Sequence, residues 1–161
     1  MIGLRQILNS VEFYGIKTEL DKRSEEFWKN ALHGYKWRFD HITLGHRSRV
    51  TEENKASLIQ AIVNNGEKVE FIVDAIGRYK KDSESCVIAF RVKDNEVFLL
   101  DEETGLRNGI KMKGINKTFH ITIATTGNCF PVESNKIESW IKIGDMRMRG
   151  EVKIWERVPP R

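Results

Sequence analysis

The sequence predicts a single α+β domain, residues 1–161, in which at least two helices pack against a largely antiparallel sheet. A chain of 161 residues is long enough for one domain with a sizeable core. Hydrophobic residues make up 40% of the chain and charged residues 31%, an ordinary composition for a folded, soluble protein. Two segments have the apolar spacing of helices, and several shorter segments separated by turns have the pattern of strands.

Residues 20–32 form the first predicted helix. Asp21 or Ser24 can cap its start, and Gly34 lies where the end of a helix favours a left-handed residue. The apolar spacing predicts its buried side to be Phe27, Trp28, Ala31 and Leu32.

Residues 51–64 form the second predicted helix, which Thr51 caps and Gly66 ends. A shorter helix is expected within residues 131–141, where Ser134 fits a cap position. The apolar side of the second helix is predicted to be Ala56, Leu58, Ile59, Ile62 and Val63.

The other periodic segments are predicted strands. The five-residue turn 80–84 separates two of them and suits a hairpin. Glycine and lysine in residues 102–117 indicate a loop, and the prolines of the tail 159–161 cannot continue a strand. The predicted strands are 35–44, 68–79, 85–93, 96–101, 118–125 and 151–158, and residues 1–17 form a strand or an irregular lead-in.

Charge, cysteines and hydropathy limit the cellular setting. The net charge of +4 and the pI near 9.1 mildly favour an anionic partner, but do not require nucleic acid. Cys86 and Cys129 lie beside apolar residues without Cys-x-x-Cys spacing, which predicts buried free thiols in a reducing compartment. The sequence has neither a signal-peptide pattern nor a run of about 20 apolar residues. We therefore expect a cytoplasmic protein with no membrane partner.

Two predicted strands carry the same pattern, a histidine and a threonine separated by one isoleucine. Residues 39–44 read FDHITL, and residues 119–123 read FHITI. Side chains alternate between the two faces of a strand, so each histidine shares a face with its threonine while the isoleucine points into the core. Side by side, the strands would place four polar groups around one cleft: His41, Thr43, His120 and Thr122.

These four groups suit hydrolysis of a phosphodiester. In-line displacement needs a base for the attacking water and an acid for the leaving oxygen, and an imidazole with a pKa of about 6.5 can serve as either. Threonine hydroxyls can donate to phosphate oxygens. The sequence has no His-Glu-x-x-His motif and no Cys/His quartet, so we predict neither a metal nor another cofactor. The structural alternative is that both histidines are half-buried strand residues bonded to nearby threonines.

The paired motifs resemble the 2H phosphoesterase superfamily, which is named for two His-x-Thr/Ser motifs. The likeness is greatest to one branch, the cyclic phosphodiesterase domain of fungal and plant tRNA ligases. Residues 41–47 (HITLGHR) resemble its first motif. Residues 120–125 (HITIAT), followed by 131–135 (PVESN), resemble its second. The resemblance covers roughly residues 35–140.

This resemblance implies a bilobal fold, with two pseudosymmetric lobes of antiparallel strands and helices around a central groove. It implies opening of a 2′,3′-cyclic phosphate at an RNA end to leave a 2′-phosphate, with His41 and His120 as acid and base and Thr43 and Thr122 on the phosphate. We favour His120 as the base that activates water. The chain lacks the kinase and ligase modules of that branch, so separate enzymes would act as partners. We expect a monomer.

Three further residues are predicted substrate contacts. Trp37 shares the face of the first histidine and could stack on a base, although core packing is the alternative. Arg47, like His46, could reach a flanking phosphate or simply lie in a solvated turn. Tyr79 lies in the basic segment 78–81, which could meet RNA or form a solvated hairpin. Lysines that could steer a polyanion precede the second motif: Lys111, Lys113 and Lys117.

Two other functions fit the same motifs. An enzyme with identical catalytic pairs could cleave a cyclic nucleotide or a cyclic oligonucleotide messenger, because only the rim of the groove would differ. A binding module could recognise RNA or nucleotide ends without turnover. The presence of both complete motifs argues against the binding module, since loss of one histidine is the simplest route to inactivity.

Overall fold

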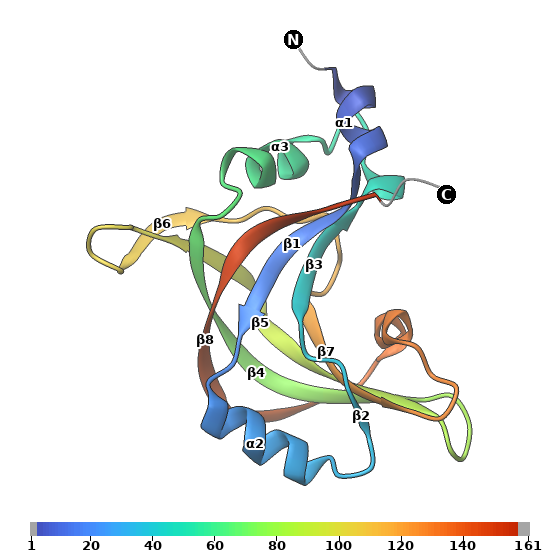
Figure 1. Cartoon of the computed structure of the whole chain (residues 1–161). Coiled ribbons are helices and arrows are strands. Elements are labelled where there is room, and N and C mark those ends of the chain that lie inside the picture. Colours follow the sequence, from blue (N-terminus) through green and yellow to red (C-terminus); the bar gives the residue numbers. More distant parts are fainter. Residues whose placement is uncertain (1–2, 158–161) are drawn as a thin grey trace.

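The computed structural model describes residues 3–157 as an antiparallel sheet with helices around it, in agreement with the α+β prediction (Figure 1). The helices are α1 Leu4–Ser10, α2 Lys22–Ala31, α3 Ala56–Val63 and the short 3-10 helices η1 Arg47–Arg49 and η2 Pro131–Lys136. The strands are β1 Val11–Glu19, β2 Lys36–Trp37, β3 His41–His46, β4 Lys68–Lys80, β5 Cys86–Leu100, β6 Arg107–Lys111, β7 His120–Thr126 and β8 Trp140–Glu156.

Six strands close into a barrel. Their order is β7-β3-β1-β8-β4-β5, and β5 pairs with β7 to complete the ring. β2 and β6 extend the sheet beside β7 and β5. The strand pairs of the described residues are antiparallel. Sequence periodicity did not reveal the closure, because it does not specify which strand edges meet. The predicted division into two pseudosymmetric lobes stays a prediction.

The barrel encloses the core, as the alternation in the two histidine strands requires. Ile42 and Leu44 of β3 and Ile121 and Ile123 of β7 are buried, as predicted. Phe119, just before β7, is buried as well. The histidines and threonines therefore project from the outer face of the barrel. The two thiols are free and buried, as predicted: Cys86 and Cys129.

α2 lies across one end of the barrel (Figure 1). The prediction of Asp21 as its cap is confirmed, since an Asp21 carboxylate oxygen accepts a hydrogen bond of 2.8 Å from the Ser24 amide. Trp28 packs edge-on against Phe90 of the core, with ring centroids 4.9 Å apart. The predicted buried side is wrong for Phe27, which is 63% exposed. Ala31 is exposed too, because only the narrow stripe of Trp28 and Leu32 reaches the core.

α3 lies at the opposite end and is shorter than predicted (Figure 1). It begins at Ala56 rather than at Thr51, whose amide instead donates to Asn54. Its buried residues are Ser57, Leu58 and Ala61, and the Tyr14 hydroxyl donates to Ser57 at 2.8 Å. Most of the predicted apolar side faces outward, since the helix rests on the barrel rim through a different face; the exposed residues are Ala56, Ile59, Ile62 and Val63.

Several strand boundaries differ from the prediction. The expected strand 35–44 is interrupted at residues 38–40, and β5 runs through residues 94–95, where a break was predicted. Asp94 and Asn95 have positive φ yet stay within β5. The predicted loop 102–117 contains β6, the N-terminal segment contains α1 as well as β1, and β8 begins at Trp140. Val158 and the tail 159–161 lie outside the described residues.

Gly15 permits the close approach of β1 to β3. A Cβ at this position would overlap the carbonyl oxygen of Ile42 and lie 3.1 Å from the amide nitrogen of Leu44. We therefore expect Gly15→Ala to lower the free energy of unfolding by about 1–3 kcal/mol or more, because these backbone atoms must move apart. Gly144→Ala is the matched control, since nothing lies within 4 Å of its Cβ. Urea unfolding measures both, and equal midpoints would contradict this role of Gly15.

Candidate active site

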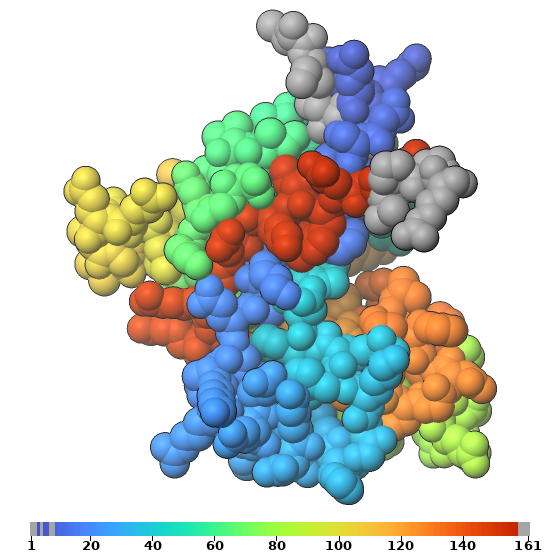
Figure 2. Space-filling model, in the orientation of Figure 1, coloured from blue at the N-terminus to red at the C-terminus, as the bar shows by residue number. Residues whose placement is uncertain are grey.

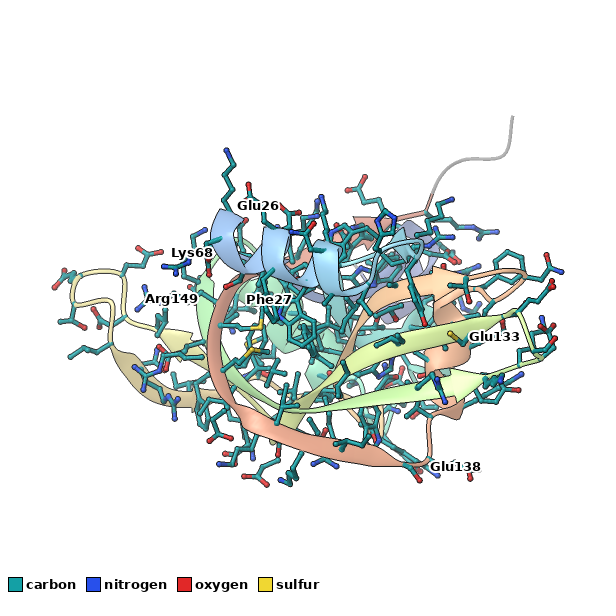
Figure 3. All side chains as sticks on the ribbon, turned by 90° about the horizontal axis from the view of Figure 1, so that it is seen from below. Glu26, Phe27, Lys68, Glu133, Glu138 and Arg149 are labelled. Carbon is teal, nitrogen blue, oxygen red and sulfur yellow. The ribbon has the colours of Figure 1, made fainter. Side chains whose placement is uncertain are left out.

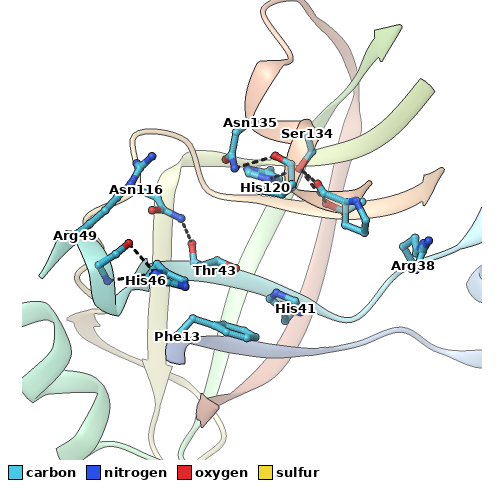
Figure 4. A pocket seen from close by; sticks show the side chains of 14 residues that line it. Phe13, Arg38, His41, Thr43, His46, Arg49, Asn116, His120, Ser134 and Asn135 are labelled. Atoms are coloured by element: carbon cyan, nitrogen blue, oxygen red, sulfur yellow. Dashed lines mark hydrogen bonds between the residues drawn. The ribbon is translucent and has the colours of Figure 1, made fainter. Parts of the chain in front are cut away.

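The two His-x-Thr strands lie side by side. β3 and β7 pair antiparallel, with Ile42 opposite Ile121. In this register each histidine lies beside the threonine of the other strand, on the face away from the core. On the molecular surface, the cyan residues of β2–β3 adjoin the orange residues of β7–η2 (Figure 2). All four polar side chains line one cavity of about 570 Å³: His41, Thr43, His120 and Thr122 (Figure 4).

His41 is oriented by a carboxylate. Its Nδ1 lies 3.0 Å from an Asp40 oxygen, and Asp40 also bonds Lys17. Burial alone would raise the pKa of Asp40, but the hydrogen bonds from Lys17 and His41 outweigh it and hold the pKa below its usual value. The ionised carboxylate places the His41 proton on Nδ1. The rings of Phe13 and Trp155, each centred 5.0 Å from the imidazole, fix its plane.

His120 has a different environment. Its Nδ1 lies 3.1 Å from the carbonyl oxygen of Thr118, which can only accept, so Nδ1 carries the proton. Burial lowers the pKa of His120; the bond to Thr118 opposes this, and the nearby charge of His41 lowers the pKa further. In the neutral ring Nε2 is then an acceptor. The Ser134 hydroxyl lies 2.8 Å from this Nε2.

The two threonines also differ. The Thr43 hydroxyl has no hydrogen-bond partner within residues 3–157, so it is available to a ligand. The Thr122 hydroxyl lies 3.0 Å from the Ser134 hydroxyl and 3.3 Å from the Pro131 carbonyl oxygen. Ser134 also contacts that carbonyl, at 2.7 Å. The single Ser134 hydroxyl proton thus has three possible acceptors, which are the Pro131 carbonyl, the Thr122 hydroxyl and His120 Nε2. When the proton points toward Pro131, the imidazole Nε2 is free to accept from another donor.

Glu133 anchors the segment that carries Ser134. One of its oxygens accepts from the Phe130 amide at 2.9 Å, and the other lies 3.4 Å from Lys81 Nζ. The amide of Phe130, the thiol of Cys129 and the charge of Lys81 lower the pKa of Glu133 to about 2. Burial and the adjacent Glu133 raise the pKa of the Cys129 thiol to about 11. At neutral pH this carboxylate is therefore ionised and the thiol protonated.

The cavity lining is cationic and contains no carboxylate. Arg38 and Arg49 lie toward opposite ends of the cavity, with the histidines between them (Figure 4). Arg38 Nε donates to the Thr125 hydroxyl at 3.1 Å. Neither arginine forms an ion pair within the described part of the chain. Such a lining favours an anionic ligand.

The three further predicted substrate contacts do not line this cavity. Trp37 stacks on Phe39, with ring centroids 5.9 Å apart, and packs against the core. Arg47 Nε is paired with Glu12 at 3.1 Å. Tyr79 lies on β4, where Lys136 covers its ring. Their roles as substrate contacts stay predictions. His46, by contrast, lines the cavity and bonds Glu12 and Ser48.

Sequence reasoning missed several residues around the histidines. Asp40 precedes the first histidine directly, and that adjacency was an available signal. Ser134 lies in the segment that resembles the second family motif, but a capping role was predicted for it instead. Phe13, Arg38 and Asn116 come from segments without a motif, and only the folded chain brings them to the cavity.

No family model matches the chain. The chain is similar to a protein of Shouchella clausii (strain KSM-K16) named "Putative phosphoesterase", with 31% identity over 110 residues. The match covers 60% of this chain and 63% of that protein, so the chain spans less than two-thirds of its relative. No solved structure matches.

Within 3–157, no group of three or more His, Cys, Asp or Glu side chains could hold a metal ion. Of the helices described there, none combines the length and apolar character that crossing a bilayer requires.

We expect the pKa of His120 to lie below the ordinary histidine value of about 6.5, because partial burial disfavours the charged ring. Above about pH 6.5 this histidine is neutral in both the folded and the unfolded chain. As the pH falls below about 6.5, the unfolded chain takes up the proton before the folded chain does, so the free energy of unfolding decreases. NMR titration of the ring protons, assigned with His120→Gln, measures the pKa. A value of 6.5 or higher would refute the environment described for His120.

Proposed function

We propose that this protein hydrolyses 2′,3′-cyclic phosphates at RNA ends, without a metal, by acid–base catalysis between His41 and His120. The observation that carries the proposal is the β3–β7 register, which puts both His-x-Thr pairs in one carboxylate-free cavity. The similarity to a protein named as a phosphoesterase supports phosphoester hydrolysis in general. The specific cyclic substrate rests on the motifs and on the chemistry of the cavity.

The environments of the histidines divide their roles. His120 Nε2 accepts a proton from water as the water oxygen bonds to phosphorus. The bond from phosphorus to the ribose 3′-oxygen breaks, and His41 Nε2 gives its proton to that oxygen. The product carries a 2′-phosphate and a 3′-hydroxyl. Thr43 and Thr122 donate to the non-bridging oxygens, on which charge accumulates.

We further propose that the chain belongs to the 2H phosphoesterase superfamily, near the tRNA-ligase branch. The antiparallel pairing at Ile42 and Ile121 relates the two motifs by an approximate local twofold axis, which is compatible with two pseudosymmetric lobes. Kinase and ligase activities would then come from separate enzymes acting with a cytoplasmic, monomeric end-healing protein.

Substitution of either catalytic histidine provides the first test. We expect His41→Ala and His120→Ala each to lower kcat/KM by at least about 10²-fold, since each removes one proton-transfer group. His33→Ala is the matched control, because His33 is exposed beyond the end of α2. Full activity in either cavity variant would remove that histidine from the mechanism.

The substrate panel separates the proposal from its alternatives. Short RNA ending in a 2′,3′-cyclic phosphate is offered beside 3′,5′-cyclic nucleotides and cyclic dinucleotides, with and without chelator. The proposal expects chelator-resistant turnover of the RNA end and a bell-shaped pH profile. Turnover of only the other diesters would favour a messenger phosphodiesterase. Binding of the RNA end without turnover would favour a recognition module.

Asp40 is a positioning residue in this scheme. Asp40→Asn should lower kcat/KM by about 10-fold or more, because the neutral amide no longer fixes the His41 proton on Nδ1. In the pH profile of Asp40→Asn, the limb that reports the proposed acid, His41, should shift. Asp40→Glu should retain part of the wild-type activity that Asp40→Asn loses. Asp145→Asn is the control, since that carboxylate pairs with Lys93 alone. An unchanged profile in Asp40→Asn would show that the carboxylate has no part in orienting the acid.

A further inference from the structure

A second cavity adjoins the catalytic one. Its volume is about 480 Å³, and Asn116 lines both cavities. Asn116 Nδ2 donates to the Thr43 carbonyl oxygen at 2.8 Å, which fixes the side chain at the junction. Asn116 and Arg49 lie toward the same end of the catalytic cavity (Figure 4), and the second cavity shares Asn116 as part of its wall.

Hydrogen bonds to neighbouring segments hold the wall of the second cavity in place. Asn54, in this wall, donates to the Arg49 carbonyl oxygen at 3.0 Å. The Lys113 carbonyl accepts from the Ser57 hydroxyl at 2.8 Å, and its amide is bonded to Gln60. These bonds tie the segment before β7 to α3, so the cavity is preformed by hydrogen-bonded structure.

The charges at the junction favour a chain of phosphates. Arg49 and Lys113 form no ion pair within residues 3–157. Lys111, also in the lining, is only loosely paired with Glu96, at 3.7 Å. Asp94 is the opposing charge in this cavity. Of the two unpaired cations, Arg49 lines the catalytic cavity and Lys113 lines the cavity beyond it. Backbone phosphates of an oligonucleotide would find a cation in each cavity.

We propose that the second cavity binds the nucleotides upstream of the reacting end, so that the substrate is a single-stranded oligonucleotide rather than a mononucleotide. The proposal rests on the proposed function. Because the cyclic phosphate closes the 3′ end, the chain can leave the catalytic cavity only from the 5′ side of the last ribose. Arg49 and Lys113 bind its phosphates.

A second group of arginines lies too far from the catalytic cavity to bind the upstream nucleotides. Arg107, Arg147 and Arg149 surround the buried carboxylate of Glu70, at 3.1, 3.5 and 4.0 Å. Arg149 and Glu133, which marks the catalytic side, lie at opposite sides of the molecule (Figure 3). Arg147 therefore offers a control with a cation far from the catalytic cavity.

The test is a chain-length series with the intact protein. The kcat/KM values are compared for a nucleoside 2′,3′-cyclic phosphate and for RNAs of two, three and six nucleotides with the same end. We expect a rise of at least about 10-fold between one and three nucleotides and little change thereafter, since roughly 1.4 kcal/mol of added binding gives that factor. Lys113→Gln should lower the ratio of the six-nucleotide to the one-nucleotide value by about threefold or more. Arg147→Gln should leave that ratio as in the wild type.

The two proposals fail separately in this experiment. Equal kcat/KM for one and six nucleotides would overturn the second binding site while leaving the cyclic phosphodiesterase in place. If none of the substrates is turned over, the activity is overturned, and fluorescence anisotropy with a six-nucleotide RNA bearing a 2′-phosphate decides the site. The second binding site is supported if Lys113→Gln weakens RNA binding and makes the slope of log K against log salt concentration shallower by about 0.7. The second binding site is overturned if Lys113→Gln binds the RNA as tightly as the wild type does, or if the wild type does not bind the RNA.

Discussion

Everything at the candidate site depends on the pairing of β7 between β3 and β5. β5 supplies six residue pairs along β7, whereas β3 meets it at the single pair of Ile42 and Ile121. Burying those two isoleucines closes the barrel and, through the alternation of a strand, forces both histidines and both threonines outward. A register shift of one residue would bury the polar groups and expose the isoleucines. Core packing and site geometry are therefore specified by the same contact.

The two His-Ile-Thr segments of the site have the same sequence, but their histidines have different charged and hydrogen-bonding neighbours. His41 contacts an ionised carboxylate and two aromatic rings, Phe13 and Trp155, which stack on each other. His120 is half-buried, with its Nδ1 bonded to a carbonyl and its Nε2 near the Ser134 hydroxyl. Burial lowers the pKa of the second imidazole, whereas the first imidazole is hydrogen-bonded to a carboxylate. The repeated motif therefore presents two histidines with different surroundings.

The surroundings of the histidines favour an anionic ligand. Carboxylates near the cavity are engaged by cations, as Asp40 is by Lys17 and Glu12 is by Arg47. Arg38 and Arg49 line the cavity and form no ion pair within residues 3–157.

The sequence by itself determined the antiparallel α+β class, the outward and inward faces of both His-x-Thr strands, and the four groups that meet in the cavity. It could do so because strand alternation is local and the motif repeats. It could not determine the barrel closure, the exposed faces of α2 and α3, or the contacts of Ser134, Arg38 and Asn116. Those depend on which distant strand edges and helix faces meet. The tertiary structure alone decided the difference between His41 and His120, because burial and hydrogen-bond partners come from segments that no local pattern connects.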